Sequence, residues 1–435
     1  MMAPVLWRLA EYAEWSLAAL WMWRTNEAIR RIDEVPDIST PAWDLVPPDN
    51  AAPALTVVVP ARNEGETIRA TLDCLIAQQY PNLRVLAIDD RSTDKTRQIV
   101  DEFAARYPDR VSAIHIDYLP EGWLGKTFAL EVGTRNSAGD YLLFTDADVL
   151  FSPSSLRRAM AFAATTHADH VILMPTPQVK GRGEGMMLGF LSLLGVWLVR
   201  PWRVSDPKAR HDVLGVGAFN LVRREALEVL GGWEPQRMAV VEDITLGRRM
   251  KAAGMRQRIA FGPELVVIHW ARGALGIVRG LTKNIFASVG FNPLLMLAAG
   301  VAMLVLFLGP LAGLAWIVTL MPALLALCAL VACYRVMSER SRVGASYGWL
   351  YPVAVAAMAW AILRSMASVW ARRGVMWRGT FYPLHELRRH NSPWQWERTA
   401  AGARRAEEKS APDRSLACTL ARAAPEGTQE GAVKD

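Results

Sequence analysis

The amino-acid sequence predicts an α/β domain with a mainly parallel sheet, followed by a C-terminal α-helical transmembrane region. Two observations support this prediction. Between residues 55 and 291, short apolar runs alternate with segments whose apolar residues recur at helical spacing, a pattern typical of parallel strands covered by helices. The 42 residues from 293 to 334 then contain no Asp, Glu, Lys or Arg, and about 20 such residues are enough to cross a bilayer.

The composition supports a folded domain joined to membrane segments. The chain has 435 residues, of which 52% are hydrophobic and 21% charged, with 49 Lys and Arg against 42 Asp and Glu. These values exclude a disordered chain, a collagen-like chain and a small disulfide-rich protein. The four cysteines show no metal-binding spacing, so we expect neither a structural zinc site nor a disulfide framework.

We divide the chain into four parts. Residues 1–53 are expected to form a membrane-associated helix and a Pro-rich linker, because charges at Arg8, Glu11 and Glu14 interrupt the apolar stretch from Val5 to Trp23. A helix lying on the bilayer surface fits this pattern better than a signal peptide or a span. Residues 54–291 are the α/β domain, 292–371 are transmembrane helices, and 372–435 are a basic juxtamembrane segment and a disordered tail.

Within the α/β domain, each element has its own signal. Helical spacing of apolar residues predicts the first of the two expected helices, and a Ser or Thr cap marks the start of the second. The expected strands are Leu55–Pro60, Leu83–Asp89, Val111–Ile116 and Tyr141–Thr145, and the expected helices are Thr67–Gln79 and the segment from Ser92 or Thr93 to Tyr107. The apolar stretch Gly185–Val199 is too short to span and is expected to lie in the interface or line a groove.

The membrane segments raise a question of topology. Gly309-Pro310 is expected to divide the first apolar run into two spans, and Tyr347–Trp370, which contains Arg364, is a third apolar stretch. Residues 371–406 carry eight Arg and two Glu, which indicates contact with anionic lipid and not nucleic acid. Arginines also follow the second span. If all three apolar segments crossed the bilayer, these arginines and the basic region 371–406 would lie on opposite sides of the membrane. Either the third segment is re-entrant or interfacial, which we favour, or the tail lies outside.

Three acidic pairs lie at strand ends or helix starts, each open to two interpretations. Asp89-Asp90 either caps a helix or binds a ligand beyond the carboxyl end of a strand. Asp146-Ala-Asp148 either forms a turn or binds Mg²⁺ or Mn²⁺ against a diphosphate. Glu242-Asp243 either complements a helix dipole or supplies a base.

Two further features are weaker. Lys126 ends a Gly-containing loop at a helix start, a place suited to a phosphate, although the spacing is not that of a P-loop. His269 follows a strand-like run from Leu265 to Ile268. It is interpreted either as a third metal ligand or as a structural histidine.

The order of these motifs along the chain resembles the family 2 glycosyltransferases of the GT-A fold. The resemblance covers about residues 55–269. The Gly122–Lys126 segment, the Trp202–Pro207 stretch and the multi-span C-terminal half are most similar to the hopene-associated glycosyltransferases of bacteria. It implies that Asp90 contacts the nucleotide base in a pocket that includes Pro60, Arg62, Asn63 and Glu64. It also implies that Asp146 and Asp148 bind ribose and the metal-diphosphate, with Asp243 as general base, Glu242 beside it and Lys126 near the diphosphate. Gly217–Asn220 and Gly231–Trp233 would lie near the acceptor.

The activity implied is inverting transfer of a sugar from a nucleotide-sugar, with a UDP-sugar expected, to a membrane lipid in hopanoid biosynthesis. The expected cofactor is Mg²⁺ or Mn²⁺, and the expected location is the inner membrane with a cytoplasmic catalytic domain. The alternatives are a polyprenyl-phosphate, carotenoid or ceramide-type glycosyltransferase, and a non-catalytic scaffold that binds nucleotide-sugar or lipid. The chain lacks the Gln-x-x-Arg-Trp of processive synthases, and Trp377-Arg378-Gly379, which resembles an element of the lipid-acting relatives, has no assigned role.

Overall fold

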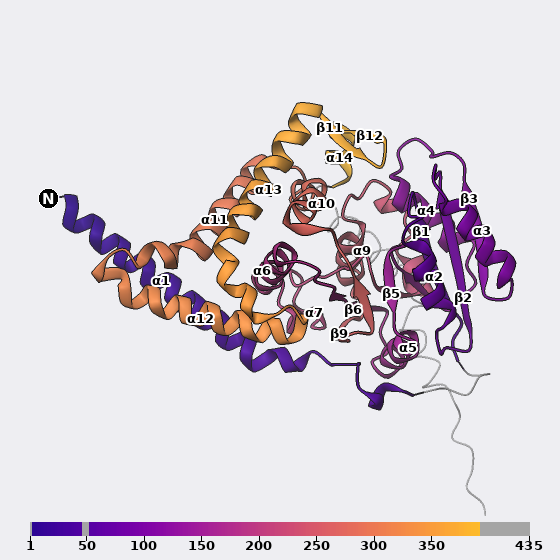
Figure 1. Ribbon diagram of the computed structural model, residues 1–435, viewed down its shortest axis with the longest axis horizontal. Coiled ribbons are helices and arrows are strands. Elements are labelled where there is room, and N and C mark those ends of the chain that lie inside the picture. The colour runs from indigo at the N-terminus through magenta and orange to yellow at the C-terminus, as the bar shows by residue number, and fades with distance from the viewer. Residues whose placement is uncertain (1, 46–51, 392–435) are drawn as a thin grey trace, which may run out of the picture.

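The computed structural model describes residues 2–45 and 52–391, and Figure 1 shows its layout. The strands are β1 Leu55–Ala61, β2 Leu83–Asp90, β3 Val111–Ile116, β4 Tyr141–Phe144, β5 Val149–Phe151, β6 His170–Met174, β7 Thr176–Pro177, β8 Asn220–Arg223, β9 Gln257–Phe261, β10 Val266–Ile268, β11 Gly374–Trp377 and β12 Thr380–Pro383. The α-helices are α1 Met2–Arg31, α2 Ile68–Ile76, α3 Thr96–Arg106, α4 Gly125–Arg135, α5 Ser155–Thr165, α6 Arg182–Leu198, α7 Pro201–Val204, α8 Arg224–Val229, α9 Glu242–Ala252, α10 Gly273–Ser288, α11 Pro293–Gly313, α12 Ile317–Ser341, α13 Tyr351–Arg372 and α14 Leu384–His390. Short 3₁₀ helices lie at Ile32–Glu34, Pro41–Trp43, Glu234–Gln236 and Ala345–Leu350.

The main sheet has the strand order β3-β2-β1-β4-β8-β6-β9. β1 pairs in parallel with both β2 and β4, and only β8 runs antiparallel to its neighbours. The carboxyl ends of β1, β2 and β4 therefore meet at one edge, where ligands of open α/β sheets bind. The prediction of a mainly parallel GT-A-like α/β domain followed by apolar helices is confirmed.

The two faces of the sheet are covered by different helices. One face packs against α2, α3 and α5 through a core that contains Leu72, Phe103 and Phe162. The other packs against α4, α8 and α9 through Leu130, Leu227 and Met250. Short apolar runs such as Leu55–Ala61 form central strands because both faces are buried, so they show no polar alternation.

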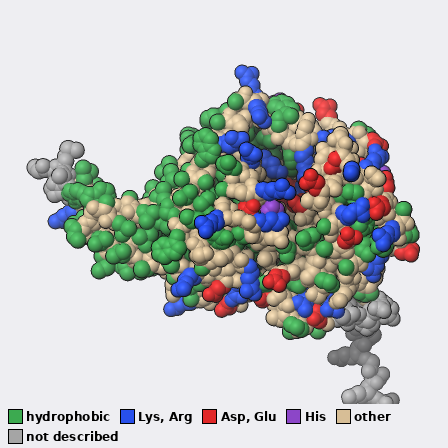
Figure 2. Space-filling view, in the orientation of Figure 1, with side chains coloured by type: hydrophobic (Ala, Val, Ile, Leu, Met, Phe, Trp, Pro, Cys, Tyr) green, Lys and Arg blue, Asp and Glu red, His purple; other side chains and the backbone are tan. Residues whose placement is uncertain are grey.

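The helical region forms a separate core around α6, α10, α11, α12 and α13. Three helical segments are long and apolar enough to cross a membrane, namely Pro293–Gly313, Ile317–Ser341 and Ala345–Arg372. α1 runs along α12 on the opposite side of the molecule from the sheet (Figure 1), and Trp21 in α1 donates a hydrogen bond to the Leu306 carbonyl at 2.9 Å. Figure 2 shows hydrophobic side chains gathered over this end and charged ones over the α/β domain, as expected of a protein with one end in lipid.

Two local predictions were wrong. The second helix begins at Thr96, not at Ser92 or Thr93, because those residues are held by the loop after β1. The Asn63 N–H donates to Ser92 Oγ at 3.0 Å, and the Thr93 N–H donates to Asn63 Oδ1 at 2.8 Å. The first span also continues through Pro310 to Gly313. Pro310 has no N–H to donate to the Leu306 carbonyl four residues before it, and that carbonyl accepts the Trp21 Nε1–H at 2.9 Å instead.

The last helix of the membrane region, α13, starts and ends beside the α/β half of the chain. Before its start, Tyr347 packs directly on Gly185 of α6. After its end, the hairpin formed by β11 and β12 returns to β1, where Arg378 donates hydrogen bonds to the Arg62 carbonyl and to Glu64. The prediction that Gly185–Val199 lines a groove fits α6, which borders the cavity described next.

Candidate active site

A cavity of 820 Å³ opens at the carboxyl edge of the sheet and extends toward the membrane helices. It is visible as a hollow with Lys and Arg side chains around it in Figure 2. Nine of the ten residues predicted for the site line it: Pro60, Arg62, Glu64, Asp90, Lys126, Asp146, Asp148, Glu242 and Asp243. Asn63 is the exception, because its side chain accepts the Thr93 N–H and so shapes the loop after β1.

Lys126 joins two of the acidic motifs. Its Nζ lies 2.5 Å from Asp146 Oδ1 and 2.6 Å from Glu242 Oε1. Burial alone would lower the Lys126 pKa, but the two carboxylates outweigh burial and raise it. Lys126 therefore stays protonated and holds the ends of β4 and α9 together.

Asp148 is the acid in the cavity with an uncompensated charge. Burial, followed by repulsion from Asp146 and Glu64, raises the pKa of Asp148 to about 6. No cationic side chain pairs with it among the residues that the structure describes. A carboxylate of raised pKa that is exposed to the cavity and has no cationic partner favours a bound cation.

Asp243 lies in the first turn of α9, and its Oδ1 accepts the Ile244 N–H at 2.7 Å. Burial, then the neighbouring Glu242 charge, raises the pKa of Asp243 to about 7. The backbone at Gly215 packs against it so closely that a Cβ there would be 2.0 Å from the Asp243 carbonyl. A carboxylate with a pKa near neutrality is suited to proton transfer.

Asp90, which is predicted to contact the nucleotide base, is bound by arginines. Arg91 donates to both carboxylate oxygens of Asp90, at 2.7 and 3.0 Å, and Arg62 Nη1 lies 3.9 Å from Asp90 Oδ2. Asp90 is nevertheless part of the cavity lining. It is a paired carboxylate at the end of β2, rather than the cap of a helix.

The two glycine segments differ in position. Gly217 lies against Asp146 and Lys126, where a Cβ would be 2.8 Å from Asp146 Oδ2. Asn220 is buried and bonded to His170 at 3.1 Å. Trp233 packs edge-on against Phe144, with ring centroids 4.9 Å apart, and borders a small pocket beside Asp243.

His269 lines the cavity, and its Nε2 lies 3.6 Å from Oε2 of the buried Glu184 of α6. Within residues 2–45 and 52–391, no group of three or more His, Cys, Asp or Glu side chains is arranged to hold a metal ion. Asp146 and Asp148 remain as a pair of carboxylates. Mg²⁺ commonly binds through one or two carboxylates, with waters and substrate phosphates as the other ligands.

The second wall of the cavity was predicted only in part, through the apolar stretch of α6. Leu188, Leu191 and Val196 of α6 and Met337 of α12 make it apolar, and Lys283 of α10 adds one cation. The hairpin adds Trp377, Arg378 and Tyr382, whose hydroxyl accepts the Gly125 N–H at 3.3 Å. A sequence signal for the hairpin existed, since Arg378-Gly379 between two apolar pairs is a two-residue turn. Both residues have positive φ, as a type I′ turn requires.

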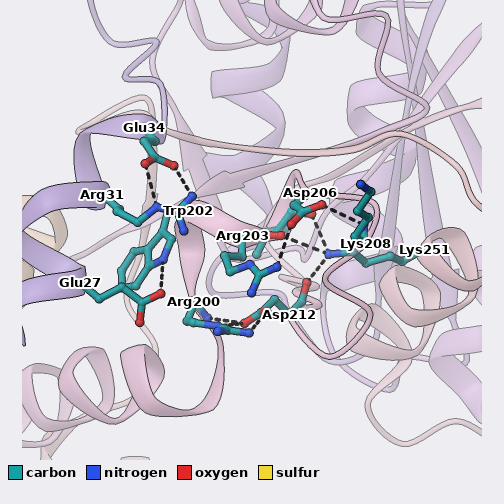
Figure 3. Close-up of polar contacts among 11 residues, drawn as sticks. Glu27, Arg31, Glu34, Arg200, Trp202, Arg203, Asp206, Lys208, Asp212 and Lys251 are labelled. Atoms are coloured by element: carbon teal, nitrogen blue, oxygen red, sulfur yellow. Dashed lines mark hydrogen bonds and ion pairs between the residues drawn. The ribbon is translucent and has the colours of Figure 1, made fainter. Parts of the chain in front are cut away.

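Figure 3 shows a polar network that holds the segment between α6 and the Gly215 loop. Arg200 pairs with Asp212 through two hydrogen bonds of 2.9 and 2.6 Å. Lys251 of α9 donates to the Asp212, Val204 and Arg203 carbonyls at 2.6, 3.0 and 3.4 Å. Trp202 donates to Glu27 of α1 at 3.2 Å. The N-terminal helix is thus joined to the segment that leads to Asp243.

Comparison with known proteins agrees with this geometry. Residues 56–231 match the family described as glycosyl transferase family 2. The probable glycosyltransferase YdaM of Bacillus subtilis is 26% identical over 199 residues, which cover 45% of this chain and 46% of that protein. The 4,4'-diaponeurosporenoate glycosyltransferase of Staphylococcus aureus is 26% identical over 240 residues, covering 54% and 62%. The chain thus matches less than two thirds of either relative.

A solved structure supports the fold. The mannosyltransferase PcManGT from Pyrobaculum calidifontis, in complex with GDP-Man and Mn²⁺, has a TM-score of 0.50 at 21% identity, covering 84% of this chain and 99% of that one. Together with the sheet order and the family match, these similarities lead to one conclusion. Residues 56–231 match glycosyl transferase family 2, and the domain that contains them has a GT-A-like fold.

Proposed function

We propose that the protein is an inverting glycosyltransferase that moves a sugar from a nucleotide-sugar to the hydroxyl of a membrane lipid. One observation carries the proposal. A single cavity joins the acidic residues at the ends of β1, β2 and β4 to an apolar wall built by α6 and α12. A polar donor and an apolar acceptor could therefore meet beside Asp243.

In this proposal Asp243 is the general base. Its carboxylate takes the proton of the acceptor hydroxyl as the oxygen attacks the anomeric carbon, and the nucleoside diphosphate leaves from the opposite face. One base is sufficient, because inversion needs no covalent intermediate. Glu242, bound to Lys126, keeps a negative charge beside Asp243 and so favours a proton on the Asp243 carboxyl.

Asp146 and Asp148 are proposed to hold Mg²⁺ or Mn²⁺. The unpaired, raised-pKa carboxyl of Asp148 fits a cation, and the solved mannosyltransferase contains Mn²⁺. The ion would offset charge on the departing diphosphate. Asp90, Arg62, Pro60 and Glu64 are proposed to bind the nucleoside side of the donor, with Asn63 shaping that loop.

The acceptor we propose first is a hopanoid triterpenoid, because the C-terminal half resembles hopene-associated glycosyltransferases. A carotenoid is the second candidate, since the Staphylococcus aureus relative is a diaponeurosporenoate glycosyltransferase. A UDP-sugar is the donor we propose, and a GDP-sugar the alternative suggested by the mannosyltransferase. The enzyme would lie in the inner membrane with its α/β domain in the cytoplasm.

The test is a transfer assay with purified full-length protein and the Asp243→Asn variant. Loss of a positioned base is expected to lower transfer by about 10²–10⁴-fold while nucleoside diphosphate binding stays within about threefold of wild type. Lipid analysis of a strain lacking the gene, searched for an accumulating unglycosylated triterpenoid, identifies the acceptor. Undiminished transfer by Asp243→Asn would refute the base.

A further inference from the structure

The cations of the cavity differ in their partners. Four of the five lysines and arginines that line it are paired with carboxylates: Arg62 with Asp90, Lys126 with Asp146 and Glu242, Arg340 with Asp33, and Arg378 with Glu64. The fifth, Lys283 of α10, has no carboxylate partner among the residues that the structure describes. Its recorded contact is with Trp377, whose ring centroid lies 4.6 Å from Nζ.

The surroundings of Lys283 make an unpaired ammonium costly. Burial, followed by the nearby positive charge of Lys126, lowers the Lys283 pKa, and the charges of Glu242 and Asp146 offset only part of this effect. An aromatic face offsets only part of the lost hydration. A charged lysine at this buried position lowers the stability of the protein, and a bound anion would remove that cost.

The position of Lys283 also points to a ligand. α10 carries it to the polar end of the cavity, opposite the wall that contains Lys126 and Asp146. The hairpin residues Trp377 and Arg378 sit beside it, and Arg378 is held by Glu64 and the Arg62 carbonyl. Among the described residues, Lys283 is therefore the lining cation without a carboxylate partner, and it faces the space proposed for donor and acceptor.

We propose that Lys283 binds a phosphoryl group of a substrate, as a point charge contributed to the donor site by the membrane half of the chain. The inference rests on the proposed function. Phosphoryl oxygens suit it because an ammonium on a flexible stem donates to them without fixed geometry. The phosphoryl group would belong either to the nucleoside diphosphate of the donor or to a phosphorylated lipid acceptor.

The experiment compares wild type, Lys283→Met and Lys283→Arg as full-length protein in detergent with Mn²⁺. Binding of UDP and GDP is measured by calorimetry beside that of uridine and guanosine, which lack phosphates. Farnesyl phosphate and farnesol are compared in the same way. Lys208→Met is the matched control, because Lys208 is exposed and outside the cavity and only its backbone N–H is bonded to Asp206.

If Lys283 holds the donor diphosphate, Lys283→Met weakens nucleoside diphosphate binding by about 10–100-fold, the loss expected for a charge-assisted hydrogen bond. Nucleoside binding stays unchanged, and Lys283→Arg recovers to within about threefold of wild type. If Lys283 holds an acceptor phosphate, the variant instead loses the preference for farnesyl phosphate over farnesol.

Two results would overturn the inference. One is a Lys283→Met protein that binds all probes like wild type. The other is an equal loss for nucleosides and diphosphates, which would make Lys283 a structural residue. Wild-type protein that binds neither nucleoside diphosphate nor farnesyl phosphate would instead overturn both the proposed function and the inference about Lys283.

Discussion

The two walls of the 820 Å³ cavity are built in different ways. The acidic wall comes from the ends of neighbouring strands and from α9, so the sheet places Asp90 and Asp146, and the first turn of α9 places Asp243. The opposite wall comes from α6, α10, α12 and the β11–β12 hairpin, which are brought together only by helix packing. The first wall is polar and locally determined, whereas the second is mostly apolar and depends on contacts between distant segments.

This difference suggests that the two walls of the cavity have different functions, which mutations can test. Changes to the acidic wall should affect the donor and the chemistry. Changes to the helical wall other than at Lys283 should affect the acceptor and leave donor binding intact. A mutation on one wall that impaired the function of the other would break the comparison.

Beside Asp243→Asn, the largest effect is expected for Asp148→Asn. Removing this carboxylate should weaken Mn²⁺ binding and lower transfer by about 100-fold or more, because the ion would lose one of two protein ligands. Metal affinity is measured by calorimetry and transfer by product formation with and without EDTA. Asp109→Asn, an exposed acid outside the cavity, is the control. Equal activity in EDTA and Mn²⁺ would contradict a metal role.

The pH profile of the acidic wall is expected to follow Asp243. With a pKa raised to about 7, the carboxyl is protonated below that pH and cannot accept a proton. We expect kcat/KM to fall about tenfold per pH unit below 7 and to level above it. The variant Asp243→Asn should lack this step.

The same shift predicts an effect on stability. A raised carboxyl pKa means that the folded protein binds more protons than the unfolded chain between about pH 4 and 7. The stabilising effect of this bound proton is lost as pH rises through 7. Asp243→Asn should therefore be more stable than wild type at pH 8, by a few degrees in Tm. A lower Tm would show that the ionised carboxylate is stabilised by contacts of its own.

The role of the helical wall can be tested by placing a larger side chain in the cavity at Gly195. Gly195 lines the cavity, and a Cβ there would meet no atom within 4 Å. Gly195→Leu should therefore fold, occupy acceptor space and raise the acceptor KM about tenfold, with nucleoside diphosphate affinity unchanged. Gly181→Leu, which is equally unobstructed but outside the cavity, is the control. Unchanged kinetics with a long-chain lipid would place the acceptor elsewhere.

The smallest effect is expected at the contact between α1 and the segment that follows α6. Trp202→Phe removes the hydrogen bond to Glu27 and should lower the free energy of unfolding by about 1 kcal/mol, with donor binding unchanged. Thermal unfolding measures it, against Trp349→Phe, whose ring is 86% exposed. A large loss of transfer without loss of stability would instead show that α1 controls the position of the Gly215 loop.

The comparison also explains what could be predicted from the sequence. The strands of the acidic wall and the residues at their ends were predictable, because buried parallel strands are continuous apolar runs and their carboxyl ends meet at one edge. Asn63 was assigned to the pocket because it lies within the motif, and only the structure shows its side chain bonded to Thr93. Residue spacing cannot reveal such a bond.

The helical wall could be predicted only in part. The short apolar stretch of α6 indicated a groove, but Lys283, Trp377 and Arg378 gave no sign of being neighbours. Their proximity depends on α10 packing against α13, where Ser365 donates to the Thr282 carbonyl at 2.5 Å. Contacts between helices about 80 residues apart are determined by side-chain fit, which a single sequence does not reveal.

The placement of α13 has a consequence for how the chain threads a bilayer. A polypeptide that leaves the sheet at α10 and returns to it at Arg378 must traverse the lipid an even number of times. α11 and α12 would supply those two passages, and α13 would then lie along the headgroup boundary, with Arg364 exposed toward phosphates. Arg372 and Arg388 would emerge on the same side as the nucleotide pocket, where anionic lipid could anchor the hairpin over the donor.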